Sequence, residues 1–182
     1  QTLHPYGRKI LDTGGSSSGS GVSTTSNLAA GSLGSETSGS ILSPSSANSL
    51  VGMKPTIGNV SRAGIVPISS TLDTAGPMTK FVIDNILIYN AINDFDPLDN
   101  YSVENYDINL ESVINNKTIE YRMGYYKSFY ERDFLYKNSV DFLKEKGLDL
   151  VDIDAPEIRL EGFAKILDED MRHDLRSYLS SY

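Results

Sequence analysis

The feature that most constrains this sequence is a long stretch of small polar residues near its start. Residues 14–40 read GGSSSGSGVSTTSNLAAGSLGSETSGS, in which glycine and serine dominate. This composition is typical of a flexible linker, and that interpretation stays open at this point. Apolar residues nevertheless recur at short intervals over residues 13–51, and a disordered linker usually lacks such anchors. Small side chains also let backbone segments approach closely, as a buried active-site loop requires.

Turn residues and one apolar helix follow this stretch. Gly and Pro are dense over residues 52–67, which indicates tightly turned backbone rather than long helices. Residues 80–92 combine helical spacing with nearly continuous hydrophobicity, so we predict a well-buried helix there, with Thr79 as its N-cap. Residues 94–116 are acidic and rich in turn-forming residues, which favours a surface connection.

The last third of the chain alternates between strand and helix patterns. The predicted elements are a strand over 117–125, a helix over 133–146 ended by Gly147, a strand over 148–153 and a helical region that begins at Pro156. This order predicts an α/β fold with crossover connections. We therefore expect a core over 1–93, an acidic connection over 94–116 and a continuation of the same domain over 117–182.

Charge and composition exclude several classes of function. The net charge is −8, and residues 1–80 carry +2 whereas residues 81–182 carry −10. Neither half has the clustered basic patch that nucleic acid requires, and no apolar run approaches the ~20 residues that span a bilayer. The absence of cysteine excludes disulfides, thiolate metal ligands and a cysteine nucleophile, and fits a cytoplasmic protein. With two histidines, a multi-histidine metal site or a Ser–His pair is poorly supplied.

Four sequence blocks, taken in order, carry the most specific signal. They read GGSSSGS (14–20), LGSETSGSI (33–41), VGMKPTIGNVSRAGIVP (51–67) and LDTAGPMTK (72–80). Together with the lead-in LHPYGRKILDT, they resemble the signature region of the amidase signature family of serine hydrolases. The resemblance implies a mixed β-sheet core flanked by helices, of which this chain would hold a part. Residues 117–182 match the family only in their general strand–helix pattern.

The resemblance also implies roles for individual serines. Ser40 matches the family's acylated nucleophile, and Ser16 matches its second catalytic serine, whose preceding peptide bond is cis in the family. Gly15 and Ser17 would support Ser16, and a glycine at position 15 would suit a crowded backbone. A serine hydroxyl is a weak nucleophile and needs an adjacent base, which a desolvated lysine can provide through a bridging serine.

The backbone amides of Thr37, Ser38 and Gly39 match the loop that forms the family's oxyanion hole. Small residues there let successive N–H groups converge on one oxygen, and loss of one such donor typically costs ~10²–10³ in rate. The resemblance implies no metal ion and no organic cofactor. The expected partner is a small-molecule amide, and the exposed edges of an incomplete sheet leave self-association into homo-oligomers open.

Each of these residues also has a purely structural interpretation. Ser40 would suit the N-cap of a short helix that begins at Ile41, and Ser17 or Ser18 could take the role assigned to Ser16. We interpret Lys54 as scaffold, Arg62 and Asp73 as packing and turn residues, and His4 and His173 as surface or interface side chains.

Two departures from the family's pattern bear on activity. The family usually has Ile-Arg after the nucleophile, whereas Ile41 is here followed by Leu42 and a serine-rich run. The family's base is a lysine upstream of the first block, and Lys9 belongs instead to the lead-in. We therefore expect this chain to be an internal piece of a longer protein, with the base before Gln1, and expect the piece alone to be inactive.

The predicted function is hydrolysis of a carboxylic amide through a serine acyl-enzyme, which gives an acid and ammonia or an amine. Two other functions stay open. One is the glutamine-hydrolysing subunit of a tRNA-dependent amidotransferase, against which Leu42 and the GPMTK of residues 76–80 argue. The other is a non-catalytic scaffold with a decayed site, which Leu42 and the serines after it would favour.

Overall fold

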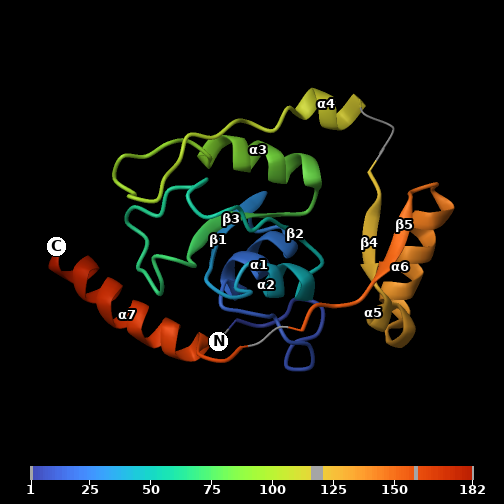
Figure 1. The fold of residues 1–182 in the computed structure, drawn as a ribbon, viewed down its shortest axis with the longest axis horizontal. Coiled ribbons are helices and arrows are strands. Elements are labelled where there is room, and N and C mark those ends of the chain that lie inside the picture. Colours follow the sequence, from blue (N-terminus) through green and yellow to red (C-terminus); the bar gives the residue numbers. More distant parts are fainter. Residues whose placement is uncertain (1, 116–120, 158–159, 182) are drawn as a thin grey trace. The chain divides into compact units, whose positions relative to one another are not determined.

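The computed structural model describes residues 2–115, 121–157 and 160–181, which form two compact units (Figure 1). The first unit contains residues 1–110 and 162–182, and the second contains residues 111–161. The elements of the first unit are α1 (Ser18–Thr25), β1 (Gly31–Glu36), α2 (Leu42–Ala47), β2 (Val51–Gly52), β3 (Thr74–Thr79), α3 (Val82–Ile92) and α7 (Phe163–Ser180). Mixed helices and strands of this kind confirm the predicted α/β class.

The sheet of the first unit has three antiparallel strands in the order β1-β3-β2. All six residues of the central strand β3 are buried, because helices or loops cover both of its faces. Met78 approaches Gly21 of α1, whereas Ala75 packs with Val60 and Tyr89, the latter on α3. Side chains of opposite parity on a strand point to opposite faces, so α1 and α3 lie on different sides of β3.

The buried part of the first unit is small and unusually polar. Its buried apolar residues among those described are Ile41, Val60, Ala75, Met78, Ile86 and Tyr89. Buried polar residues outnumber them, and include Thr24, Thr25, Glu36, Ser45, Asn48, Ser69, Asp73, Thr74, Thr79, Asn85 and Asp99. Because buried polar groups are costly unless they are hydrogen-bonded, this unit depends on particular polar partners.

The Gly/Ser-rich segment is an ordered part of this unit, so the linker interpretation is wrong. Residues 18–25 form α1 and residues 31–36 form β1, which pairs with β3 along its whole length. Serine hydroxyls join the two elements: Ser20 Oγ donates to the Leu33 carbonyl at 2.8 Å, and Ser32 Oγ donates to the Ser20 carbonyl at 2.9 Å. The serines thus serve as short cross-links between closely spaced backbones.

The second unit is built from β4 (Met123–Tyr126), α5 (Lys127–Arg132), α6 (Phe134–Glu145) and β5 (Leu150–Ile153), with α4 (Leu110–Asn115) at its boundary. Strands β4 and β5 pair in parallel, with Met123 opposite Leu150. Gly147 follows α6 at φ +84° and confirms the predicted helix end. The strand predicted over 148–153 is confirmed as β5, whereas part of the strand predicted over 117–125 lies outside the described residues.

Three expectations about helices are wrong. Thr79 is the last residue of β3 rather than a helix N-cap, and Phe81 occupies the cap position of α3. Helix α3 is only half buried, since Phe81 beside it is 67% exposed and Val82 and Leu87 are exposed as well. The final helix begins at Phe163, after the left-handed Gly162, and not at Pro156.

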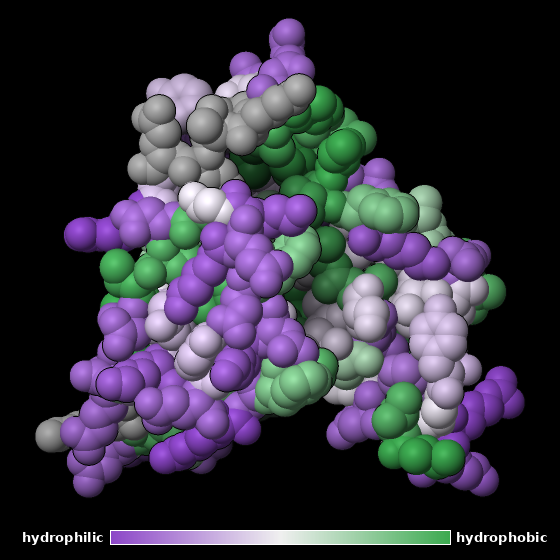
Figure 2. Space-filling view, turned by 90° about the vertical axis from the view of Figure 1, so that its right-hand side faces the viewer, coloured by the Kyte–Doolittle hydropathy of each residue, from purple (hydrophilic) through white to green (hydrophobic). Residues whose placement is uncertain are grey.

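Exposed apolar side chains are common on this chain. Figure 2 shows such residues gathered in several patches among polar ones on one face. No helix in the described part of the chain is long and apolar enough to cross a membrane. The domain boundaries expected from the sequence stay a prediction.

Candidate active site

The segments that carry Ser16 and Ser40 are joined by a backbone hydrogen bond. Ser16 lies just before α1, and Ser40 lies between β1 and α2. The backbone N–H of Ser17 donates to the carbonyl of Ser40 at 3.1 Å. The fold therefore brings together two segments whose serines are 24 positions apart in the sequence.

Ser17 fastens this junction to the sheet. Its hydroxyl donates to the carbonyl of Ser35 at 3.1 Å and accepts the Ser35 N–H at 3.2 Å. Gly34 permits the close approach, because a Cβ there would lie 3.0 Å from the Ser17 hydroxyl oxygen. The hydroxyl of Ser17 is thus engaged with the backbone of β1.

Ser16 is exposed and Ser40 is half-buried. Among the residues that the structure describes, neither hydroxyl has a hydrogen-bond partner. The Gly15–Ser16 peptide bond is cis. The expected crowding at Gly15 is wrong, since a Cβ there would meet nothing within 4 Å; the crowded position is Gly14, where a Cβ would lie 2.7 Å from the Pro44 backbone.

Residues 37–39 form the turn between β1 and Ser40. Gly39 has φ +84°, a conformation that favours glycine, and its carbonyl accepts the N–H of Ser43 at 2.7 Å. Ser38 is exposed, whereas Thr37 is half-buried and its hydroxyl donates to Oδ1 of Asp73. One end of the turn is therefore attached to α2 and the other to the start of β3.

Glu36 was missed by the sequence analysis, although it lies four residues before Ser40. Its buried carboxylate accepts the backbone N–H groups of Ile41 and Leu42 at 2.7 and 2.9 Å. A negative group at the start of a helix satisfies otherwise unpaired donors. Helix α2 has no side-chain N-cap, so the interpretation of Ser40 as a capping residue is wrong. An acidic residue just before a short helix was the available signal.

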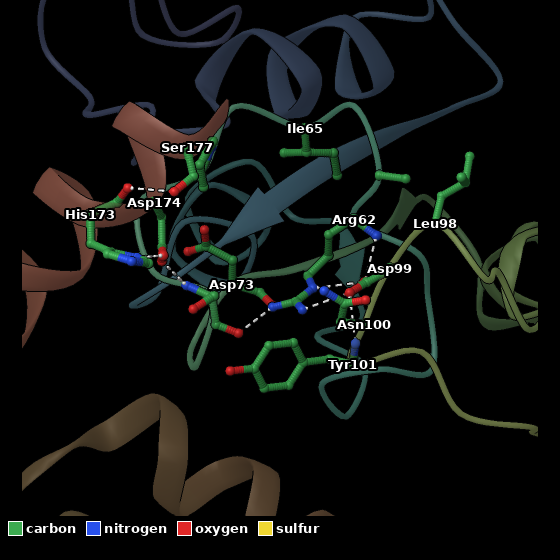
Figure 3. Close-up of a pocket in the computed structure, with 13 residues that line it drawn as sticks. Arg62, Ile65, Asp73, Leu98, Asp99, Asn100, Tyr101, His173, Asp174 and Ser177 are labelled. Carbon is green, nitrogen blue, oxygen red and sulfur yellow. Dashed lines mark hydrogen bonds and ion pairs between the residues drawn. The ribbon is translucent and has the colours of Figure 1, made fainter. Parts of the chain in front are cut away.

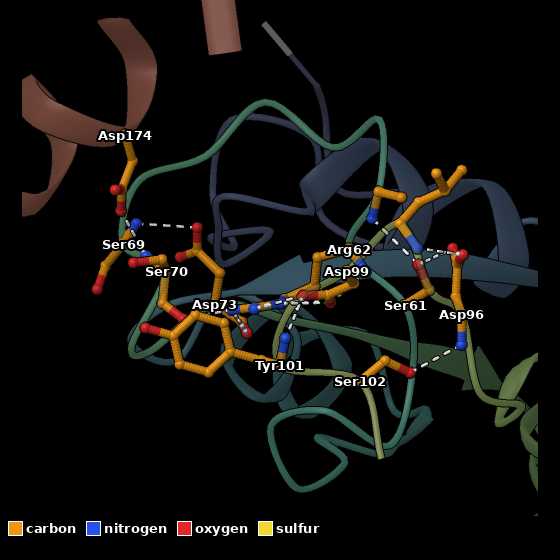
Figure 4. Close-up of polar contacts among 12 residues, drawn as sticks. Ser61, Arg62, Ser69, Ser70, Asp73, Asp96, Asp99, Tyr101, Ser102 and Asp174 are labelled. Carbon is orange, nitrogen blue, oxygen red and sulfur yellow. Dashed lines mark hydrogen bonds and ion pairs between the residues drawn. The ribbon is translucent and has the colours of Figure 1, made fainter. Parts of the chain in front are cut away.

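Arg62 connects the turns after β2 with the acidic connection (Figure 4). Its Nε and Nη2 donate to the two carboxylate oxygens of Asp99, each at 2.9 Å, and its guanidinium stacks 4.7 Å from the ring centroid of Tyr101. Hydrogen bonding to Arg62 holds the pKa of Asp99 at about 2, although burial alone would raise it. The structural interpretation of Arg62 fits these contacts, but the connection is more than surface, since Asp99 is 8% exposed.

A cleft of about 470 Å³ lies between these turns, residues 98–101 and α7 (Figure 3). Its polar lining includes Arg62, Asp73, Asn100, Tyr101, His173 and Asp174. Neither Ser16 nor Ser40 lines it. The cleft and the two serines are therefore separate features, connected through the contact between Asp73 and Thr37.

The two histidines differ in their surroundings. His4 is 4% exposed, so its assignment to the surface is wrong. Its Nδ1 accepts the Tyr6 N–H at 3.2 Å, so Nε2 carries the proton and donates to the Ala47 carbonyl at 3.0 Å. His173 lies on the exposed side of α7, as expected. Lys54 donates to the carbonyl of Pro55, which fits a scaffold role.

Comparisons with known proteins agree on one family. A family model described as Amidase matches residues 1–180. A probable amidase of Arabidopsis thaliana is 58% identical over 85 residues, which are 47% of this chain and 17% of the relative. A glutamyl-tRNA(Gln) amidotransferase subunit from Bdellovibrio bacteriovorus is 40% identical over 149 residues, which are 79% of this chain and 30% of the relative.

Solved structures give the same result. An amidase family protein from Bacillus anthracis is 30% identical, with a TM-score of 0.88 over 99% of this chain and 37% of that chain. The native peptide amidase from Stenotrophomonas maltophilia is 31% identical, with a TM-score of 0.82 over 100% of this chain and 39% of that chain. The chain thus spans less than two fifths of the length of each of these relatives.

Proposed function

Because this chain belongs to the Amidase family, we propose that the full gene product hydrolyses a carboxylic amide through a serine acyl-enzyme, with Ser40 as its nucleophile. The observation that carries the proposal is the junction at Ser17, which joins the segment of Ser16 to the carbonyl of Ser40. Both serine hydroxyls are without partners among the described residues. They are therefore available for chemistry, unlike Ser17, whose hydroxyl is engaged with β1.

In the proposed reaction, the Ser40 hydroxyl oxygen attacks the amide carbonyl carbon. Its proton passes through Ser16 to a base, and the same proton then goes to the nitrogen of the leaving ammonia or amine as the C–N bond breaks. Backbone N–H groups of residues 37–39 stabilise the negative oxygen that forms. Water then attacks the acyl group and releases the acid, which restores the Ser40 hydroxyl.

The base is assigned to a lysine outside residues 1–182. Lys54 and Lys80, which lie in the first unit, donate to the Pro55 carbonyl and to the Asn27 side chain. Neither contact involves Ser16 or Ser40. We further propose a cytoplasmic protein that acts on a small amide and requires no cofactor, with self-association favoured by the exposed apolar residues of α3.

A serine-directed fluorophosphonate, combined with release of ammonia from simple amides, tests the proposal on the full gene product. We expect covalent labelling that Ser40→Ala abolishes, together with a loss of amide turnover of at least about a thousandfold. Ser46→Ala is the matched control, because Ser46 is an exposed serine of the adjacent helix α2, and it should keep both signals. Labelling that survives Ser40→Ala would contradict the proposal, and an enzyme with neither signal would instead be the scaffold.

A second candidate is glutamine hydrolysis within a tRNA-dependent amidotransferase. Relatives named as subunits of glutamyl-tRNA(Gln) amidotransferase cover as much as 97% of this chain at 34% identity. Against this candidate, Leu42 and residues 76–80 resemble a stand-alone amidase. Hydrolysis of simple amides by the purified protein without other subunits supports the stand-alone enzyme, whereas glutamine hydrolysis that requires other subunits supports the alternative.

A further inference from the structure

We propose that Asp73 is a positioning residue for the loop of residues 37–39, and that α7 takes part through the turn of residues 68–71. This inference rests on the proposed function, in which the backbone of residues 37–39 stabilises the oxyanion. Asp73 makes no contact with Ser40 itself, so it would act only through the position of Thr37. Its interpretation as a turn residue is therefore incomplete.

Sheet register explains why Asp73 meets Thr37. Strand β1 ends at Glu36 and β3 begins at Thr74, and these two residues lie opposite each other in the antiparallel ladder. The next residue on one strand and the preceding residue on the other must therefore also face each other. They are Thr37 and Asp73, and the Thr37 hydroxyl donates to Oδ1 of Asp73.

The second carboxylate oxygen of Asp73 holds a different segment. Oδ2 accepts the backbone N–H groups of Ile68 and Ser69 at 2.8 and 2.9 Å, and Asp73 is buried. A buried carboxylate with a donor on each oxygen has little freedom to rotate, because any rotation leaves a charged oxygen unpaired. Asp73 therefore couples the position of Thr37 to the turn of residues 68–71.

Helix α7 fixes this turn from the far end of the sequence. Oδ2 of Asp170 accepts the hydroxyls of Ser69 and Thr71 at 2.5 and 2.9 Å, and Oδ2 of Asp174 accepts the Ser70 N–H at 2.6 Å. Asp170 and Asp174 are four residues apart and so share one face of the helix. Figure 4 shows Asp174 directed at Ser70, with Asp73 beside the same turn.

Arg62 completes the surroundings of the turn. Its Nη1 donates to the carbonyls of Ser70 and Asp73, so a positive charge faces the turn from the segment after β2. The three aspartates that hold the turn therefore share one nearby guanidinium. This arrangement gives a continuous path of hydrogen bonds from α7, through residues 69–71 and Asp73, to Thr37.

A double-mutant cycle in the full gene product tests whether Asp73 acts through Thr37. Asp73→Asn keeps the shape but replaces one acceptor oxygen with a donor, and Thr37→Val removes the hydroxyl. Each change should lower kcat by about 10–100-fold with little effect on KM, because a displaced loop harms mainly the transition state. The double variant should be little worse than either single variant, and Thr37→Ser should restore kcat.

Matched controls and opposite outcomes make this cycle decisive. Asp107→Asn changes an exposed aspartate of the same unit and should leave kcat unchanged. Losses in kcat that simply multiply in the double variant would overturn the proposal, as would Thr37→Ser with the activity of Thr37→Val. If Asp73→Asn fails to fold, Asp170→Asn on α7 replaces it in the same cycle with Thr37→Val.

Hydrogen exchange separates this inference from the proposed function. Peptides that cover residues 35–42 should exchange faster in Asp73→Asn and Asp170→Ala, whereas peptides from the second unit should not change. Unchanged exchange over residues 35–42 in both variants would overturn the positioning role, whether or not the protein hydrolyses amides. Faster exchange in a protein without amide turnover would support the positioning path and reject the proposed function.

Discussion

Residues 13–80 and the second unit, residues 111–161, are held together by different interactions. In the first region, buried carboxylates, hydroxyls and amides pair with backbone groups, as Glu36, Ser17 and Asp73 do. In the described part of the second unit, Val140 is the buried apolar residue, and aromatic rings meet edge to face on partly exposed surfaces. A side chain in the first region has specified partners, whereas one in the second mainly covers area.

This difference predicts different responses to substitution. Removing one member of a buried polar pair leaves the other without a partner, and the cost of desolvation is then not offset. Removing part of an exposed aromatic contact costs only the contact itself. We therefore expect large losses of stability from single polar substitutions in the first region and small losses in the second.

Arg62→Ala should give the largest effect. Both members of the Arg62–Asp99 pair are at least nine-tenths buried, so the change leaves a buried carboxylate without its cation. Loss of one partner of a buried ion pair typically costs about 3–5 kcal/mol, and urea unfolding of the 182-residue chain followed by circular dichroism measures it. Arg122→Ala, an exposed arginine of the second unit, should cost less than about 0.5 kcal/mol. Equal losses in the two variants would remove the contrast between the regions.

Glu36→Ala should be the next most costly change. It removes the acceptor of two backbone N–H groups, of which that of Ile41 is buried, and we expect a loss of about 2–3 kcal/mol in the same unfolding measurement. Glu36→Gln keeps a carbonyl oxygen as acceptor and should recover part of this loss. Glu104→Ala, at an exposed position of the first unit, is the control and should be nearly neutral.

The contrast also explains what the sequence could predict. In the second unit, the helix ended by Gly147 and the strand β5 follow from periodicity and one glycine, because the side chains need only face the right way. In the first region, spacing within motifs indicated which segments belong to the signature. It did not reveal that Glu36 caps α2 or that Asp170 reaches Ser69, since such partners depend on the tertiary fold.

Helix α3 shows the same limit from the opposite side. Its nearly continuous apolar sequence predicted burial, yet the helix buries mainly Asn85, Ile86 and Tyr89. Asn85 donates its amide hydrogens to the carbonyls of Val51 and Pro77, contacts that hydrophobic periodicity cannot signal. Among candidate site residues, the positions of Ser16 and Ser40 followed from resemblance, whereas the connection of Thr37 to Asp73 required the sheet register.

Acid should weaken the first region through Asp99. Its pKa lies at about 2 in the folded chain, below the ordinary 3.8, so its contribution is fully present above about pH 4 and is lost as pH falls towards 2. Allowing for solvent screening, we expect a loss on the order of 1–2 kcal/mol over that window. The measurement is the difference in unfolding free energy between wild type and Asp99→Asn as a function of pH. A difference that stays constant from pH 5 to pH 2 would contradict this source of stability.

Phe129→Leu should give the smallest effect and tests the second region directly. The ring of Phe129 meets Tyr126 and Tyr136 edge to face, at centroid distances of 5.7 and 5.9 Å, but is itself half exposed. Leucine keeps most of the apolar area and loses only the ring geometry, so the cost should be about 0.5–1 kcal/mol, read from hydrogen exchange of the α6 amides. Phe134→Leu, on a more exposed ring, should change exchange still less. If Phe129→Leu instead cost as much as Arg62→Ala, the second unit would depend on specific partners as strongly as the first does.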